Sequence, residues 1–348
     1  MRPPLLPVET LLADTADRPR HGTEIGRSRE GRPIEAWRLG RGRHHLSLIA
    51  GCHADEPVGP LTLRRLLAFL QALPAADPLN DEYSWFVVPD VNPDGAQRNA
   101  PWVERTVPTL TADGVPGEGY DLRAYALGVE RELPGDDVEF GFPRTARDAG
   151  GRPENRAVAD FLAPGAPFAL HGTLHGMGIA PGPWFLLEPA WIERTAALRE
   201  TLRRRVKAMG LALLDVDRGG EKGFSRIDEG FSTRPDSVAM RDHFLARDEP
   251  ATAALFRPSS MEFVRQLGGD PLTFVSEMPL FLVDSFRAGT EARLELHAWL
   301  AAAARQPDHE AFARQAKERG IRPMAIADQI GLQLELINAG LLAVAAAE

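Results

Sequence analysis

The feature that most constrains this chain is an apolar strand that runs into a polar turn and then into an amphipathic helix. Residues 45–50 are mainly apolar and predict a buried strand, and residues 51–57 form the turn. Leucines then recur at the spacing of a helix with one buried face: Leu61, Leu63, Leu66, Leu67 and Leu70. The turn holds His53 and Glu56, whose imidazole and carboxylate are both good zinc ligands. The alternative is a surface pair, or a carboxylate that favours the start of the helix.

Three further segments place polar groups at the ends of apolar strands. Residues 83–89 predict a strand that leads into the turn-forming sequence Asn-Pro-Asp-Gly at 92–95. A short apolar run leads into His171, and the strand-like residues 272–279 carry Glu277. Open α/β sheets bind ligands outside the carboxyl ends of their strands. The sequence therefore predicts an α/β fold, with a mixed, largely parallel twisted sheet flanked by helices and a site at one edge.

At this point the chain resembles the zinc carboxypeptidases of the pancreatic type (funnelins), over roughly residues 20–290. Residues 25–34 are similar to the family's opening strand pair, and residues 51–56 to its His-x-x-Glu zinc motif. Residues 92–95 are identical to its Asn-Pro-Asp-Gly turn. Residues 119–123 resemble the start of its Asp-x-Asn-Arg-Asn segment, and residues 153–157 its Pro-Glu-Thr-x-Ala helix start. The motifs occur in the family's order, which makes the combination specific.

The resemblance implies a role for each matching residue. His53, Glu56 and His171 match the ligands of one zinc ion per chain, and Glu277 matches the general base and proton shuttle. Asp121 matches a carboxylate that orients a zinc-bound histidine. Such a carboxylate is expected on physical grounds, because ligating imidazoles nearly always donate their other N–H to an acceptor.

The arginines depart from the family pattern. The Asn-Arg pair that grips the substrate carboxylate is absent, and residues 123–125 read Arg-Ala-Tyr. Arg98, Arg105 and Arg123 compete for two roles. We expect Arg105 to stabilise the oxyanion, and Arg98 and Arg123 to bind substrate. The family's mobile tyrosine has no match, since the chain has only Tyr83, Tyr120 and Tyr125, all far upstream of Glu277.

For other polar residues we favour a structural role over a catalytic one. His175 lies four residues after His171 and is weighed as a ligand, with pocket lining favoured. Cys52 is the only cysteine, and adjacent residues in an extended segment point opposite ways, so we interpret it as a small buried hydrophobe. The Asp136-Asp137-x-Glu139 cluster lacks a calcium loop and is interpreted as a solvated charge run.

Composition favours a cytoplasmic enzyme with a large core. The chain has 348 residues, 44% of them hydrophobic, and a net charge of −9 that argues against a nucleic-acid partner. No apolar run approaches the ~20 residues of a membrane span, and no signal peptide is evident at the N-terminus. A single cysteine permits no intrachain disulfide. The expected partner is a peptide or acyl-amino-acid substrate, and a homo-oligomer stays open.

We expect a catalytic domain over residues 1–305 and a helical C-terminal extension over 306–348 packed on it. Residues 99–152 hold few periodic segments, and we expect them to cover the mouth of the site. Three hypotheses stay open at this level. The first is a zinc metallocarboxypeptidase that hydrolyses an amide next to a free carboxylate. The second is a zinc deacylase or amidase on an acylated amino acid or cell-wall peptide. The third is a non-catalytic binding module on the same fold.

Overall fold

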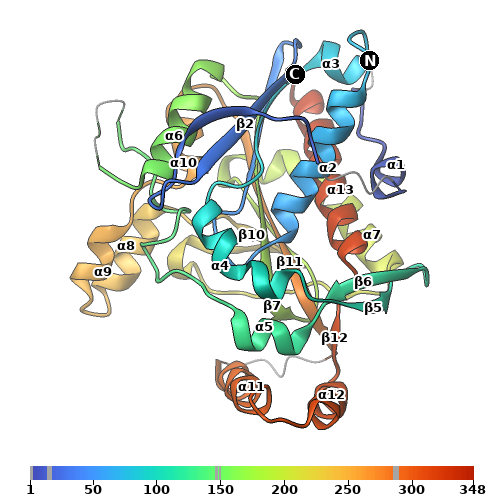
Figure 1. Cartoon of the computed structure of the whole chain (residues 1–348). Helices are drawn as coiled ribbons and strands as arrows, with labels where there is room; N and C mark the ends of the chain where they lie inside the picture. Colours follow the sequence, from blue (N-terminus) through green and yellow to red (C-terminus); the bar gives the residue numbers. More distant parts are fainter. Residues whose placement is uncertain (1–2, 14–17, 146–147, 149, 285–289) are drawn as a thin grey trace.

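A computed structural model describes residues 3–13, 18–145, 148, 150–284 and 290–348 (Figure 1). The strands are β1 (Thr23–Arg27), β2 (Pro33–Gly40), β3 (His44–Ala50), β4 (Tyr83–Val88), β5 (Thr106–Leu110), β6 (Pro116–Tyr120), β7 (Leu170–Ala180), β8 (Trp184–Leu187), β9 (Arg226–Asp228), β10 (Phe231–Thr233), β11 (Leu272–Val283) and β12 (Ile321–Pro323). The helices are α1 (Val8–Ala13), α2 (Val58–Ala72), α3 (Pro78–Glu82), α4 (Pro93–Val103), α5 (Leu122–Gly128), α6 (Pro153–Leu162), α7 (Ala196–Ala208), α8 (Ser237–Leu245), α9 (Pro250–Leu255), α10 (Ser260–Gln266), α11 (Thr290–Ala303), α12 (His309–Glu318) and α13 (Ile326–Ala347). Short 3₁₀ turns are η1 (Ala163–Gly165), η2 (Pro189–Trp191), η3 (Glu193–Thr195) and η4 (Glu221–Gly223).

One large sheet organises the molecule. Its strand order is β1-β2-β4-β3-β7-β11-β8-β10-β9, and β12 pairs with β11. The four central strands β4, β3, β7 and β11 pair in parallel, so their carboxyl ends share one edge. Antiparallel pairs flank this centre on both sides, at β2–β4 and at β11–β8. The predicted mixed sheet with flanking helices is confirmed, and its parallel part carries the strands expected to hold the site.

Helices cover both faces of the sheet because the central strands are apolar on both sides. The larger core packs α2, α7 and α13 against one face (Figure 1). The smaller core packs α6 and α10 against the other, where Val158 and Val264 meet Ile49 and Val88. Every residue of β4 is buried. This packing fixes the strands that position the site.

The C-terminal residues form part of the central structure. β12 extends the sheet beside β11, and α13 lies between α2 and α7 in Figure 1. By length and composition α13 could cross a membrane, which corrects the expectation that no run is apolar enough, but 67% of its most apolar window is buried inside the fold. Asn338 in α13 also exchanges two hydrogen bonds with the backbone of Leu6, at 2.8 and 2.9 Å, and so joins the two ends of the chain.

Candidate metal centre

The turn between β3 and α2 places His53 and Glu56 at the carboxyl edge of the sheet. Gly51 has a positive φ of 76°, and a Cβ there would meet Asp90 Oδ1 at 2.8 Å, so this sharp exit from β3 favours glycine. The amide of Val91 donates to the Ala50 carbonyl at 3.0 Å, which holds the exit of β3 against the chain that leaves β4. The turn therefore presents its side chains beyond the strand end.

Three side chains converge at this edge. His53 Nδ1 lies 2.8 Å from Glu56 Oε1, and His175 Nδ1 lies 2.8 Å from Glu56 Oε2. The two Nδ1 atoms are 3.1 Å apart. One ligand atom from each residue lies within 4.8 Å of the others. Two imidazoles and one carboxylate are the donor set of several catalytic zinc sites, and the nearness of these lone-pair atoms fits a shared cation.

Electrostatics also fits a cation at this position. Burial alone would raise the pKa of Glu56, but the charges of His53, Arg131 and His175 lower it well below its usual range. The backbone N–H of Gly176 donates to Glu56 Oε2 at 3.2 Å. Glu56 is therefore an ionised carboxylate held in place from several directions, as a ligand needs to be.

Strand register brings His175 to the cluster. The pairing of β3 with β7 ends at Ala50 opposite Leu174, so residue 175 is the first of β7 to clear the end of β3. On the other side of β7, His175 pairs with Glu277 of β11. Sequence analysis favoured pocket lining for His175, whereas the structure gives it the third position in the ligand group.

His171 lies elsewhere, which corrects its choice as the third ligand. It sits four residues earlier in β7, inside the sheet, opposite Ser47 and Thr273. Its Nδ1 lies 2.6 Å from Ser47 Oγ and its Nε2 lies 3.1 Å from Ser260 Oγ. Burial lowers the pKa of His171 to about 3. His171 is thus a neutral core histidine with both nitrogens paired to hydroxyls.

Glu277 occupies the expected place beside the ligand group. It is the one partly exposed residue of β11, and its neighbours in the register are His175 and Trp184. Burial and the charge of Glu56 raise the pKa of Glu277 to about 8, against the opposing charges of His175 and His53. A carboxyl with a raised pKa beside a cation site is suited to general acid–base chemistry.

The three arginines expected at the site do not contact the cluster. Arg98 pairs with Glu30 and Glu132, at 2.9 and 3.1 Å. Arg123 donates to the carbonyl of Gln306 at 3.1 Å, and Arg105 is exposed at the end of α4. Arg98 lies in α4, Arg123 in α5, and Arg105 between α4 and β5.

A different arginine faces the cluster. Arg131 Nη1 lies 3.0 Å from Glu56 Oε1 and 3.2 Å from Asp55 Oδ1, and its side chain is 46% exposed. These acidic partners raise the pKa of Arg131 further, although burial opposes them. Arg131 belongs to the irregular stretch that was expected to cover the site, where no periodicity marks a residue.

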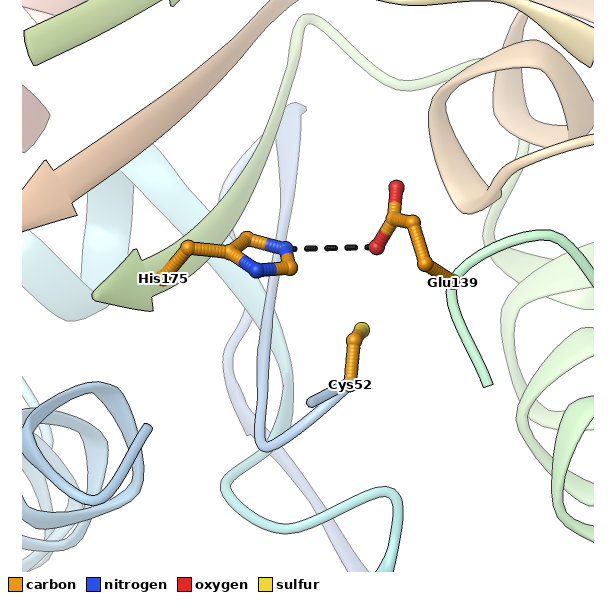
Figure 2. Close-up of side chains that lie close together, drawn as sticks. All are labelled: Cys52, Glu139 and His175. Atoms are coloured by element: carbon orange, nitrogen blue, oxygen red, sulfur yellow. Dashed lines mark ion pairs between the residues drawn. The ribbon is translucent and has the colours of Figure 1, made fainter. Parts of the chain in front are cut away.

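The carboxylate behind the ligating histidine also differs from the prediction. Asp121 caps α5 by accepting from the amides of Arg123 and Ala124, which corrects its predicted contact with a histidine. Glu139 takes that position, with Oε2 3.2 Å from His175 Nε2 (Figure 2). Asp137 and Glu139 are 9% and 4% exposed, so this cluster is not a solvated charge run.

Cys52 completes the surroundings of His175 on the side away from His53. The cysteine is buried, and burial raises the pKa of its thiol to about 12, as expected for a small hydrophobe. Its Sγ lies 3.8 Å from Thr173 Oγ1, and it forms a second close group with Glu139 and His175 (Figure 2). Neighbouring Cys52 and His53 thus face different sides of one imidazole.

A cavity of about 570 Å³ opens beside the cluster and is lined in part by His53 and Glu56. It lies among α2, α4 and β6, where further lining residues are Arg64, Arg65, Asp90, Asn92 and Tyr120. The Asn-Pro-Asp-Gly turn forms one wall: Asn92 Oδ1 accepts from the Gly95 amide at 3.1 Å and so caps α4. The cavity can hold the part of a ligand that extends away from the cluster.

Comparison with known proteins gives one sequence match. Residues 10–180 match the sequence profile described as zinc carboxypeptidase. No curated protein sequence matches the chain.

Solved structures that resemble the chain include a metallo-carboxypeptidase from Burkholderia cenocepacia, with 16% identity over 97% of this chain and 68% of the other, and a TM-score of 0.45. Bovine thrombin-activatable fibrinolysis inhibitor, in complex with tick carboxypeptidase inhibitor, shows 12% identity over 98% and 95%, and a TM-score of 0.43. Carboxypeptidase A from Helicoverpa armigera shows 14% identity over 86% and 72%, and a TM-score of 0.42.

Proposed function

Since the chain belongs to the zinc carboxypeptidase family through residues 10–180, we propose that it is a zinc-dependent metallopeptidase that hydrolyses an amide bond next to a free carboxylate in a peptide. One observation carries the proposal: His53, Glu56 and His175 converge at a strand end, and Glu277 lies beside His175 in the next strand.

His53, Glu56 and His175 would hold the zinc ion. Three protein ligands leave zinc an open position. When bound, the ion lowers the pKa of water towards ~7 and polarises the carbonyl of the substrate. The remaining steps fall to the protein's own side chains.

Glu277 moves the proton. Its carboxylate accepts a proton from the attacking water and later delivers it to the leaving nitrogen. Burial and the charge of Glu56 raise its pKa to about 8 in the metal-free protein, which favours the protonated carboxyl that delivers the proton to the leaving group. Its partial exposure, in a strand that is otherwise buried, gives the substrate access to it.

Arg131 is placed to stabilise negative charge. Its guanidinium reaches Glu56 through one nitrogen, and nearly half of its side chain is exposed. It can therefore donate to a developing oxyanion or, by a pair of hydrogen bonds, to a substrate carboxylate. Arg98, Arg105 and Arg123 lack this position.

A second candidate is an amidase or deacylase that acts on a small acylated amino acid or a cell-wall peptide. The observation that favours it is the placement of the three expected arginines away from the cluster, which leaves Arg131 as the described arginine with an observed contact there. An enzyme with one such arginine has less means to require a peptide's terminal carboxylate.

The test is a hydrolysis screen of the zinc-loaded protein. Matched peptides with a free or an amidated C-terminus would be compared with γ-glutamyl peptides, murein peptides and N-acyl amino acids. Release of the C-terminal residue from free but not amidated peptides supports the first candidate. Cleavage confined to N-acyl amino acids or cell-wall peptides supports the second. No zinc-dependent hydrolysis in any class, with Glu277→Gln as the blank, contradicts both.

A further inference from the structure

The two ring nitrogens of His175 face different surroundings. Nδ1 faces His53 and Glu56, in the group that would hold zinc. Nε2 faces buried side chains on the other side of the ring, 2.8 Å from Thr173 Oγ1 and 3.2 Å from Glu139 Oε2 (Figure 2). An imidazole that gives the lone pair of one nitrogen to a metal carries its proton on the other. The surroundings of Nε2 therefore decide how well Nδ1 can bind.

Glu139 has no other evident purpose in the described structure. The residue is 4% exposed, and neither carboxylate oxygen makes a hydrogen bond within the described chain, so its contact with His175 is an ion pair at 3.2 Å. Burying an ionised carboxylate is costly unless a partner compensates it. His175 is thus the partner that compensates this carboxylate.

The backbone around Glu139 is fixed on both sides. Asn155 Nδ2 donates to the Val138 carbonyl at 2.6 Å, and the Phe140 amide donates to Asp137 Oδ1 at 3.2 Å. The Arg257 amide donates to the Phe140 carbonyl at 3.0 Å. A Cβ on Gly141 would meet Asn155 Oδ1 at 2.1 Å, which keeps α6 close against the loop. These contacts therefore fix the position of the carboxylate, which is necessary if Glu139 is to orient another residue.

A carboxylate fixes the proton of His175 where a hydroxyl cannot. The Thr173 hydroxyl can donate to Nε2 or accept from it, so on its own it permits both ring tautomers. An ionised carboxylate only accepts, so it stabilises the tautomer with the proton on Nε2. Outer carboxylates of this kind typically contribute 10–100-fold to metal affinity, with the order of magnitude taken from known zinc sites.

We propose that Glu139 is a positioning residue that holds His175 with Nε2 protonated and Nδ1 turned towards His53 and Glu56. The inference rests on the proposed zinc-dependent function. It assigns a carboxylate to the third ligand, from a loop where sequence analysis saw only surface charge.

The test compares four proteins: the wild type, Glu139→Ala, Glu139→Asp and Asp136→Asn. The last is a matched control, because Asp136 lies on the same loop and its side chain pairs with exposed Arg29. Zinc Kd is measured by chelator competition. We expect Glu139→Ala to weaken binding by about 10–100-fold, Glu139→Asp to recover part of this loss, and Asp136→Asn to bind like the wild type.

A second readout needs no metal. Long-range ¹H–¹⁵N correlation spectra distinguish the ring tautomers of histidine. The pKa of His175 is raised in the metal-free protein, so the spectra are recorded at a pH high enough to make the ring neutral. We expect the ring proton of the wild type to lie on Nε2, and we expect this preference to fall in Glu139→Gln, which keeps the shape but loses the charge. This comparison of the wild type with Glu139→Gln tests the positioning role even if Glu139→Ala folds poorly.

The outcomes separate the inference from the proposed function. A wild-type protein that binds no zinc overturns the proposed function and, with it, this inference. One zinc per wild-type chain with an unchanged Kd in Glu139→Ala overturns the inference alone. Two zinc ions per wild-type chain, falling to one in Glu139→Ala, would make Glu139 a ligand of a second ion with Cys52, and would also overturn the positioning role.

Discussion

The side chain of Gln333 donates to the backbone carbonyl of His175, with Nε2 and O 3.2 Å apart. Gln333 lies in α13 and His175 lies in the middle of β7, and both are buried. The same amide donates to Ser276 Oγ at 3.1 Å, and its Oε1 accepts from Thr62 Oγ1 at 2.6 Å. One C-terminal side chain thus joins β7, β11 and α2 immediately behind the candidate metal centre.

Replacing Gln333 by Leu should destabilise the protein by about 1–3 kcal/mol, since it leaves buried polar groups without partners. Urea unfolding of the metal-free protein measures the loss. Gln306→Leu, at an exposed position, is the control and should change little. Equal stability of the two variants would show that α13 does not support the strand end through this amide.

Replacing each of the two histidines of β7 in a separate variant tests the ligand assignment. We expect His175→Gln to lose zinc and His171→Gln to keep about one ion per chain, because the structure places only His175 against His53 and Glu56. Elemental analysis after dialysis measures the zinc content. If His175→Gln retained zinc and His171→Gln lost it, the third ligand would be His171, as the sequence predicted.

Replacing Glu277 by Gln should preserve zinc and reduce kcat by about 10²–10⁴-fold, because the amide cannot take a proton from water. Steady-state kinetics on whichever substrate the screen identifies gives the change. A near-normal kcat at full zinc content would remove Glu277 from the mechanism.

Replacing Arg131 by Ala should lower kcat by about 10²–10³-fold if the guanidinium stabilises the oxyanion, and should mainly raise KM if it anchors a carboxylate. Arg105→Ala is the matched control and should behave like the wild type, since Arg105 is exposed away from the cluster. Wild-type kinetics in the Arg131 variant, or a large defect in the Arg105 variant, would reverse this assignment.

His171 should make the protein sensitive to acid. Burial depresses its pKa to about 3 in the folded state, against about 6.5 in the unfolded chain. As pH falls below ~6.5 only the unfolded chain takes up the proton, so stability is lost progressively down to about pH 3.

Between pH 7 and 5 this group should cost about 2 kcal/mol of unfolding free energy. His171→Gln should lose less stability over that interval than the wild type does, measured by urea unfolding at both pH values. His21→Gln, at a fully exposed side chain, should not alter the slope. Parallel pH dependence in all three proteins would contradict the depressed pKa.

Local patterns along the chain are enough to predict the fold class and half of the site. Alternation of apolar strands with amphipathic helices predicts the sheet, and the polar residues after its strands predict which edge carries chemistry. One short turn predicts His53 and Glu56 as site residues, and one apolar strand predicts Glu277. These predictions depend on local pattern, which the chain displays directly.

The choice between His171 and His175 depends on how the strands pair. Both lie on the same side of β7, because side chains alternate along a strand with a period of two and these residues are four apart. Which of them lies beyond the end of β3 depends on where β3 stops opposite β7. That point is set by the pairing of two strands that are far apart in the sequence. Arg131 and Glu139 come from a long loop with no periodicity. Their positions are set by Asp55, Glu56, Asn155 and Arg257, which lie far from them in sequence, so no local pattern could have placed them.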